Sequence, residues 1–460
     1  MYYQHRRSRR VRRFVLLSAL AAALGVIVIA TGGGSAAPSL DVKGQASPAA
    51  LKRTPAQEKA IDAAAEREVK AAADAAVEAA LKAPRLVGDA ALRGRIDLDK
   101  MEPDGDGYAV PIGDGKRRAR LTIDPALQEE AGKLLKRARA PMSAIVVMTP
   151  DGRILALAGR KQGPPSDDNA YELATTAWAP AASVFKLVTA SALLDAGVGA
   201  DEKVCFHGGL RSVMKTNLVD DRRDNRCESL SFAVAESNNA IVGKLAHKYL
   251  DGRKIEKAAR ALGWGSPPSF ALAADPSVIT PPSDELEFAQ FAAGFWSSQL
   301  TALDGALMTG AIATGGMKVE PRIVAEVVDA GGSRRPVVTG KPQRAIPRAV
   351  AEQIGKMMEQ TCQSGTAART FRSRRGGTAL DGVAVAGKTG SLSVDKPSYL
   401  GVSWFVAYAP ADKPEFIVSV VLGNPELWYI KAHTAARILL EKAMASRAVA
   451  TAGRPAAAAK

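Results

Sequence analysis

Residues 382–391 read GVAVAGKTGS, and the fold depends on whether they form a loop or a strand. The spacing of Gly382 and Gly387-Lys388-Thr389 fits a phosphate-binding P-loop, which requires a helix that starts at the Lys-Thr pair. The residues that follow, SLSVDKPSYLG, show no helical apolar period. The intervening Val383-Ala384-Val385-Ala386 suits a pleated strand better than a loop. The sequence therefore predicts a strand that carries a Lys-Thr-Gly triplet, and it argues against a nucleotide site.

A second motif supplies a candidate nucleophile. A serine that reacts without histidine needs a base one helical turn away, and Ser-x-x-Lys places a lysine there. The chain contains this pattern at Ser183-Val184-Phe185-Lys186, at Ser212 with Lys215, and at Ser393 with Lys396. Only Ser183 opens an amphipathic run, SVFKLVTASALLDAG, between Pro180 and Gly197 as helix start and stop signals. Ser183 is therefore the candidate.

The chain contains one Ser-x-Asn, at Ser237-Asn238-Asn239, and one Lys-Thr-Gly, at Lys388-Thr389-Gly390. The first motif is predicted on a helix and the last on a strand. Each motif alone is weak, but the ordered set of three is much harder to obtain by chance.

With this set the chain resembles penicillin-binding proteins and serine β-lactamases, whose three motifs match SVFK, SNN and KTGS. The segments LTIDPALQ (121–128) and WFVAYAP (404–410) resemble the transpeptidase domain of penicillin-binding proteins in particular. The resemblance spans roughly residues 120–445. It implies an α/β fold of the α+β type, with a central antiparallel sheet flanked by helices and a helical subdomain. The active site is expected between the sheet and this subdomain.

The resemblance also implies roles for the motif residues. Ser183 would attack the carbonyl of a D-alanyl-D-alanine bond, and Lys186, kept neutral by burial beside Lys388, would be its base. The other implied roles are proton relay by Ser237, substrate binding by Asn239, Lys388, Thr389 and Gly390, and an oxyanion hole from the N–H groups of Ser183 and Ser391. The alternative interpretation makes the two lysines surface charges and Ser237 a helix cap.

Three functions are consistent with these motifs. The first is a D,D-transpeptidase that cross-links peptidoglycan stem peptides and is inhibited by β-lactams. The second uses the same site with water as acceptor, as a D,D-carboxypeptidase, endopeptidase or β-lactamase. The third is a non-catalytic penicillin-binding sensor or scaffold, which the intact motifs disfavour. Only about 110 residues separate residues 14–31 from residue 141, too few for a glycosyltransferase domain. We therefore expect a monofunctional protein, with a separate glycosyltransferase as a candidate partner.

The N-terminal region predicts a membrane anchor. Residues 14–31, FVLLSALAAALGVIVIAT, carry no charge and nearly cover a bilayer core at helical rise. They follow six arginines in the first 13 residues, which should stay cytoplasmic. A cleaved signal peptide is the alternative, because GSAAP at 34–38 supplies small residues, but its apolar core would be long. We expect a single-pass protein of the bacterial inner membrane with a periplasmic or extracytoplasmic catalytic domain.

Composition excludes several other classes. The net charge is +15, and +9 remains once those six arginines are set aside. Aromatic residues make up 5%, without the basic-aromatic interleaving of nucleic-acid modules. The dispersed histidines (His5, His207, His247 and His433) and the lack of C-x-x-C predict neither a metal nor another cofactor. Cys205 and Cys227 bracket a polar stretch and predict a disulfide in an oxidising compartment, with a reduced pair of packing cysteines as the alternative. Cys362 is left without a partner cysteine.

The chain is expected to contain one large unit and a stalk. The predicted segments are a basic cytoplasmic tail (1–13), the membrane anchor (14–31), a linker and Ala-rich helical stalk (32–84, with the helix at 55–82), a small pre-domain or linker (85–140), the transpeptidase domain (141–447) and a flexible tail (448–460). Alternating apolar residues predict strand pairs at 143–148 with 153–159 and at 403–409 with 416–422, and a terminal helix at 430–445. Asp104 and Asp106 resemble a calcium loop but lack its closing glutamate, so a turn is predicted there.

Overall fold

The computed structural model describes residues 55–163, 166–208, 212–372, 380, 382–394 and 399–452. The chain divides into two units, residues 1–66 and 67–460. The predicted basic tail, membrane anchor and linker lie outside the described residues, within 1–54. None of the helices in the described part is both long and apolar enough to cross a membrane.

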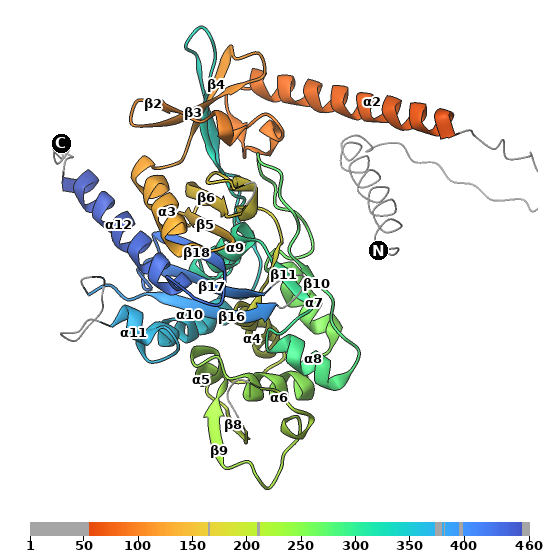
Figure 1. Ribbon diagram of the computed structural model, residues 1–460, viewed down its shortest axis with the longest axis vertical. Helices are drawn as coiled ribbons and strands as arrows, with labels where there is room; N and C mark the ends of the chain where they lie inside the picture. The colour runs from red at the N-terminus through yellow and green to blue at the C-terminus, as the bar shows by residue number, and fades with distance from the viewer. Residues whose placement is uncertain are drawn as a thin grey trace, which may run out of the picture. The chain divides into compact units, whose positions relative to one another are not determined.

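A five-stranded antiparallel sheet forms the centre of the second unit (Figure 1). Its strands, in spatial order, are β16 (Ala386–Val394), β17 (Leu400–Ala409), β18 (Phe416–Asn424), β5 (Met142–Met148) and β6 (Ile154–Lys161). Both predicted strand pairs are confirmed, and β18 pairs with β5 to join segments far apart in the sequence. The predicted strand at 383–386 is correct only for its last residue, because β16 begins at Ala386.

Helices cover both faces of this sheet. On one face lie α3 (Pro125–Ala138) and α12 (Ala432–Ala452), which share an apolar cluster with Ile145 and Val147. On the other face lie α9 (Ala302–Ala313) and α10 (Arg348–Gln363), with Ala144 and Val146. Alternate residues of each strand point to opposite faces, so a sheet buried on both faces needs apolar residues throughout. This explains why β17 and β18 are almost entirely apolar.

The terminal helix extends further than predicted. Because α12 ends at Ala452, the first residues of the predicted tail at 448–460 are helical.

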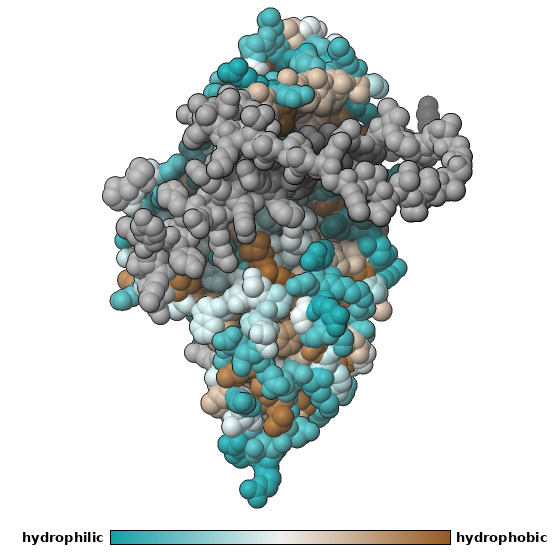
Figure 2. Space-filling view, turned by 90° about the vertical axis from the view of Figure 1, so that its right-hand side faces the viewer, coloured by the Kyte–Doolittle hydropathy of each residue, from teal (hydrophilic) through white to brown (hydrophobic). Residues whose placement is uncertain are grey.

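A helical subdomain lies beside edge strand β16. It comprises α4 (Lys186–Asp195), α5 (Leu230–Ala235), α6 (Asn239–Tyr249), α7 (Gly252–Ala261) and α8 (Glu285–Ala292). The run from Ser183 was predicted to be amphipathic, and this is wrong, because residues 186–193 are buried on all sides of α4. A short 3-10 turn, η4 (Ala182–Phe185), precedes this helix. The face in Figure 2 mixes hydrophilic residues with smaller apolar patches.

A second sheet joins the segment before residue 140 to a later one. Its order is β1 (Leu86–Val87), β14 (Arg334–Val338), β13 (Val324–Val328), β4 (Arg117–Leu121), β3 (Gly107–Ile112) and β2 (Glu102–Asp104). The residues predicted as a pre-domain or linker are therefore paired with 324–338. Asp104 and Asp106 flank the predicted turn, and both carboxylates pair with Arg120. In the part of the chain described, no group of three or more His, Cys, Asp or Glu residues could hold a metal.

The remaining elements are short except for the stalk helix. The predicted helix at 55–82 is confirmed as α2 (Pro55–Lys82). The short elements are η1 (Ala90–Leu92), η2 (Leu98–Lys100), η3 (Tyr171–Ala174), β7 (Ala179–Pro180), β8 (Lys203–Phe206), η5 (Lys215–Asn217), β9 (Arg226–Ser229), β10 (Val278–Ile279), β11 (Ser298–Leu300), β12 (Met317–Lys318), β15 (Gln343–Arg344) and α11 (Ala368–Phe371).

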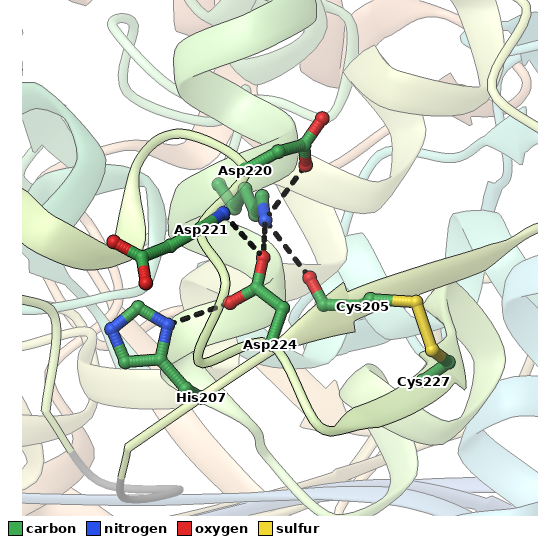
Figure 3. The surroundings of a disulfide bond; sticks show 7 residues. Cys205, His207, Asp220, Asp221, Asp224 and Cys227 are labelled. Carbon is green, nitrogen blue, oxygen red and sulfur yellow. Dashed lines mark hydrogen bonds and ion pairs between the residues drawn. A yellow bond between two sulfur atoms is a disulfide. The ribbon is translucent and has the colours of Figure 1, made fainter.

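Cys205 and Cys227 form a disulfide across β8 and β9 at the tip of the helical subdomain (Figure 3). The loop that it closes is held to helix α6 through Lys244, whose Nζ lies 2.6 Å from Asp224 and 2.9 Å from the carbonyl oxygen of Cys205. Asp224 also contacts the ring of His207 at 2.6 Å. The disulfide and this ion pair together fix the outer side of α6, whose first residue is Asn239.

We expect loss of the disulfide to loosen this tip without unfolding the central sheet. Removing a cross-link that spans 22 residues should lower the unfolding free energy of the subdomain by about 3 kcal/mol. Urea unfolding of Cys205→Ser/Cys227→Ser should therefore show a lower midpoint than the oxidised wild type, and wild type with reductant should match the variant. Identical midpoints for all three samples would contradict this prediction.

Candidate active site

The Ser183–Lys186 pair is assembled where η4 runs into α4. The Lys186 Nζ lies 2.8 Å from the Ser183 Oγ. Ala182, just before the serine, has a positive φ of 49°. Gly294 packs so close to this turn that an added Cβ would lie 2.2 Å from the Ala182 carbonyl oxygen. The turn that presents Ser183 is therefore defined by the left-handed conformation of Ala182 and by the close packing of Gly294, which follows α8.

Lys186 is fully buried, and three acceptors surround its amine. Besides Ser183, these are the Oδ1 of Asn239 at 2.6 Å and the carbonyl oxygen of Ala293. Burial, and then the positive charge of Lys388, hold the pKa of Lys186 well below its usual range. The interpretation of Lys186 as a surface charge is therefore wrong, and a neutral amine is favoured beside the serine.

The Ser-x-Asn motif forms the turn between α5 and α6. Ser237 has a positive φ of 56°, and Asn238, not Ser237, caps α6 by accepting the Ile241 N–H at 3.1 Å. The helix-cap interpretation of Ser237 is therefore wrong. This turn leaves Ser237 and Asn239 facing the other two motifs: Asn239 contacts Lys186, and the Oγ of Ser237 lies 3.1 Å from the Nζ of Lys388.

The Lys-Thr-Gly triplet lies on edge strand β16, which continues to Val394 without a helix, so it is not a P-loop. Lys388 is fully buried, and burial lowers its pKa to about 7 although Glu236 favours the charged form. The Thr389 hydroxyl contacts the Thr366 hydroxyl at 2.6 Å. Glycine at position 390 permits close approach, since a Cβ would lie 3.2 Å from Val184 and 3.3 Å from the Ala181 carbonyl oxygen.

These motifs surround a cleft of about 670 Å³. Of the predicted site residues, those lining it are Ser183, Ser237, Asn239, Thr389, Gly390 and Ser391. Lys186 and Lys388 do not line the cleft and act from beneath its surface. Of the other Ser-x-x-Lys candidates, Ser212 lies before η5 and Lys215 begins it; both are exposed, and neither lines the cleft. Ser393 lies on β16 and does line the cleft, but Lys396 is outside the described residues.

Several residues of the site were missed by the sequence analysis. The Ala293 carbonyl oxygen and Gly294 carry no motif, and their role is visible only from contacts with Lys186 and Ala182. Other cleft residues that no motif indicated are Glu236, Thr366, Trp428, Lys431 and His433. His433 had been noted only as one of four dispersed histidines. It lies near Lys431, and burial followed by that charge lowers its pKa to about 4.

We expect Gly294→Ala to damage the site more than the fold. Its Cβ would force the Ala182–Ser183 turn to move, and a displacement near 1 Å at a reacting group costs about 100-fold in rate. The measurement is the rate of Ser183 labelling by a fluorescent penicillin, the reagent that the motif set suggests. Gly332→Ala is the matched control, because Gly332 also has a positive φ, of 80°, but open space around it. Equal labelling rates for the two variants would contradict the prediction.

Residues 142–444 match a known family, the penicillin binding protein transpeptidase domain. Penicillin-binding protein PbpB of Mycobacterium tuberculosis is 24% identical over 367 residues, which are 73% of this chain and 54% of that protein. Peptidoglycan D,D-transpeptidase PbpA of the same organism is 25% identical over 308 residues, which are 65% of this chain and 61% of that protein. The chain therefore spans about half the length of the first of these relatives, and somewhat more of the second.

Solved structures share the fold. The crystal structure of PBPA from M. tuberculosis superposes with a TM-score of 0.59 at 23% identity, covering 71% of this chain and 82% of that chain. The D,D-transpeptidase domain of a peptidoglycan glycosyltransferase from Eggerthella lenta gives a TM-score of 0.61 at 24% identity, covering 79% and 92%. The structure of penicillin-binding protein A from M. tuberculosis has also been solved as a penicillin G acyl-enzyme complex. Because the family match covers more than half of its length, this chain belongs to the penicillin-binding protein transpeptidase domain family.

Proposed function

We propose that the protein is a membrane-anchored D,D-transpeptidase that cross-links peptidoglycan stem peptides through an acyl-enzyme on Ser183. The observation that carries the proposal is the 2.8 Å contact between the Ser183 Oγ and the fully buried amine of Lys186. Such a pair is an activated nucleophile with its general base in place. The protein is expected to be inhibited by β-lactams, which would acylate the same oxygen.

The surroundings of Lys186 suit a neutral amine. A neutral amine has two N–H donors and one lone pair, whereas an ammonium has three donors and no acceptor. Asn239 and the carbonyl of Ala293 take the two N–H groups, which directs the lone pair at the Ser183 hydroxyl. Lys186 then takes the hydroxyl proton as Ser183 attacks the carbonyl carbon. The developing oxyanion would be held by the backbone N–H groups of Ser183 and Ser391.

The other motif residues complete the reaction. Ser237 passes the proton to the nitrogen of the departing D-alanine. Lys388, 3.1 Å from the Ser237 Oγ, supports this transfer from beneath. The adjacent hydroxyls of Thr389 and Thr366 bind the terminal carboxylate of the substrate, Asn239 holds its amide, and Gly390 lets it lie close to β16. An amine of a second stem peptide then attacks the acyl-enzyme and restores Ser183.

The cellular setting is proposed from the family, the N-terminal sequence and the disulfide. The family acts on the cell wall, which supports an extracytoplasmic location, and the arginine-flanked apolar stretch at 14–31 supports a single-pass anchor. The disulfide between Cys205 and Cys227 agrees with an oxidising compartment. A monofunctional protein that works with a separate glycosyltransferase stays a prediction from the sequence.

Intact mass of the full chain after exposure to penicillin G tests the proposal. We expect one adduct per molecule that persists for hours, because a transpeptidase excludes water as acceptor. Ser183→Ala should lower the rate of adduct formation by more than about a thousandfold. Rapid loss of the adduct would indicate a hydrolase, and the absence of any adduct on folded wild-type protein would overturn the enzymatic function.

The dependence of acylation on pH tests the role of the lysine pair. Only neutral Lys186 accepts a proton, so the acylation rate should rise with pH and level off well below 10.5, the ordinary lysine value. The positive charge of Lys388 lowers the pKa of Lys186. Lys388→Met should therefore raise that pKa and move the rising limb to higher pH.

Lys356→Met is the matched control for this profile, because Lys356 is an exposed lysine on α10. It should leave the limb in place. A limb that stays in place in Lys388→Met, or that moves to lower pH, would contradict the assignment.

A further inference from the structure

The cleft contains one cation that the mechanism above does not use. Among the described residues that line it, Lys431 is the only lysine or arginine and Glu236 the only acidic residue. Lys186 and Lys388 are fully buried and do not line the cleft, and burial lowers both pKa values, that of Lys388 to about 7, so neither presents a charge at the cleft surface. An anionic substrate that enters the cleft therefore meets Lys431 as its exposed positive charge.

The backbone holds Lys431 firmly while its side chain stays unpaired. Its neighbours Ile430 and Ala432 are buried, and the N–H of Ala432 donates to the Ser403 Oγ at 3.4 Å. The carbonyl oxygen of Lys431 accepts the N–H groups of Thr434 and Ala435 at 3.0 and 3.2 Å. The side chain is exposed and makes no hydrogen bond or ion pair with any described residue. The backbone is thus fixed at the cleft, and the ammonium group on its flexible stem is available to a ligand.

Neighbouring contacts place Lys431 on the Thr389 side of the cleft. The His433 ring lies 6.2 Å from the ring of Phe405, and Phe405 is the cross-strand partner of Thr389. His433 is held neutral by burial and by Lys431, so it does not add a second charge. Ser403, which accepts the Ala432 N–H, is the cross-strand partner of Ser391, two residues after Thr389 on β16. Lys431 therefore lines the cleft on the side of β16, the strand that carries Thr389, and the acidic Glu236 disfavours an anion near itself.

We propose that Lys431 provides the charge that recognises the carboxylate of the substrate and of β-lactams, while Thr389 and Thr366 only orient that carboxylate. The inference rests on the proposed function and identifies its ligand as a carboxylate-terminated acyl donor. The buried Lys388 serves the proton transfer and is not the primary contact of the anion. An ammonium–carboxylate contact in a partly enclosed cleft is a strong, charge-assisted hydrogen bond.

The test compares penicillin G with its methyl ester, which lacks the negative charge but keeps the reactive ring. Lys431→Ala should lower the second-order acylation rate for the acid by about 10- to 50-fold, as expected for one charge-assisted bond. The rate for the ester should change by less than about twofold. Lys431→Arg should restore most of the rate with the acid, because it restores the charge. Equal losses for acid and ester, or no loss for either, would overturn the inference.

Two control variants separate a local contact from a general charge effect. Lys413→Ala removes an exposed lysine from the turn between β17 and β18 and should leave the acid-to-ester ratio unchanged. Glu236→Gln removes the opposite charge from the same cleft and should raise the rate for the acid. A drop in the ratio for Lys413→Ala as large as that for Lys431→Ala would contradict recognition by Lys431.

Non-covalent binding keeps this test independent of the chemistry. Calorimetry with Ser183→Ala and with Ser183→Ala/Lys431→Ala compares binding of the acid and the ester without acylation. If the double variant binds the acid more weakly but binds the ester as before, the inference is supported. The absence of a covalent adduct on wild-type protein would overturn the proposed function but would not affect this comparison. Unchanged binding of the acid would overturn the inference while leaving the function intact.

Discussion

The buried amine of Lys186 is the constraint on which the site depends. A charged lysine removed from water loses several kcal/mol of hydration unless it is paired with an opposite charge, and this one has only neutral partners. Its three contacts are satisfied if it is neutral and faces the Ser183 hydroxyl. The surrounding structure supplies those contacts from three separate segments: Ser183 from η4, Asn239 from the start of α6, and the Ala293 carbonyl from the end of α8. Each segment therefore has to be placed to within a fraction of an ångström.

The packing of the helical subdomain against the central sheet explains how these three segments are placed. Edge strand β16 lies against the turn that carries Ser183, and the Trp404 indole N–H on β17 donates to the Pro180 carbonyl oxygen at 2.8 Å. On the far side, the disulfide-closed tip holds α6 through Lys244. Glycine occurs at two close contacts around the Ser183 turn, at Gly294 against the Ala182 carbonyl and at Gly390 against Val184 and the Ala181 carbonyl. The result is a pair of buried lysines under a cleft whose surface near the nucleophile presents mainly hydroxyl and amide groups.

The motif residues and two strand pairs of the central sheet could be predicted from the sequence. Residues that belong to no motif and to no regular apolar pattern could not be predicted to contact the site. The three motifs, the two strand pairs and the stalk helix could be predicted because their spacing follows from helix and strand geometry. The sheet formed by residues 86–121 and 324–338 could not, because its strands are short and their partner is more than 200 residues away. The run from Ser183 was expected to be amphipathic, yet residues 186–193 of α4 are all buried, because tertiary packing covers every side of the helix. The Ala293 carbonyl, Thr366 and Lys431 carry no local signal, since their roles arise only when distant segments meet.

The protonation state of Lys186 in the resting protein tests the central claim most directly. Nuclear magnetic resonance of the full chain with 13C-labelled lysine side chains follows each Cε resonance with pH, and comparison with Lys186→Arg assigns the signal of interest. The account predicts that this signal titrates well below the ordinary lysine value of 10.5, with the amine neutral under conditions where acylation is fast. A Lys186 signal that titrates together with the surface lysines would contradict it, because the base would then be charged and unable to accept the serine proton.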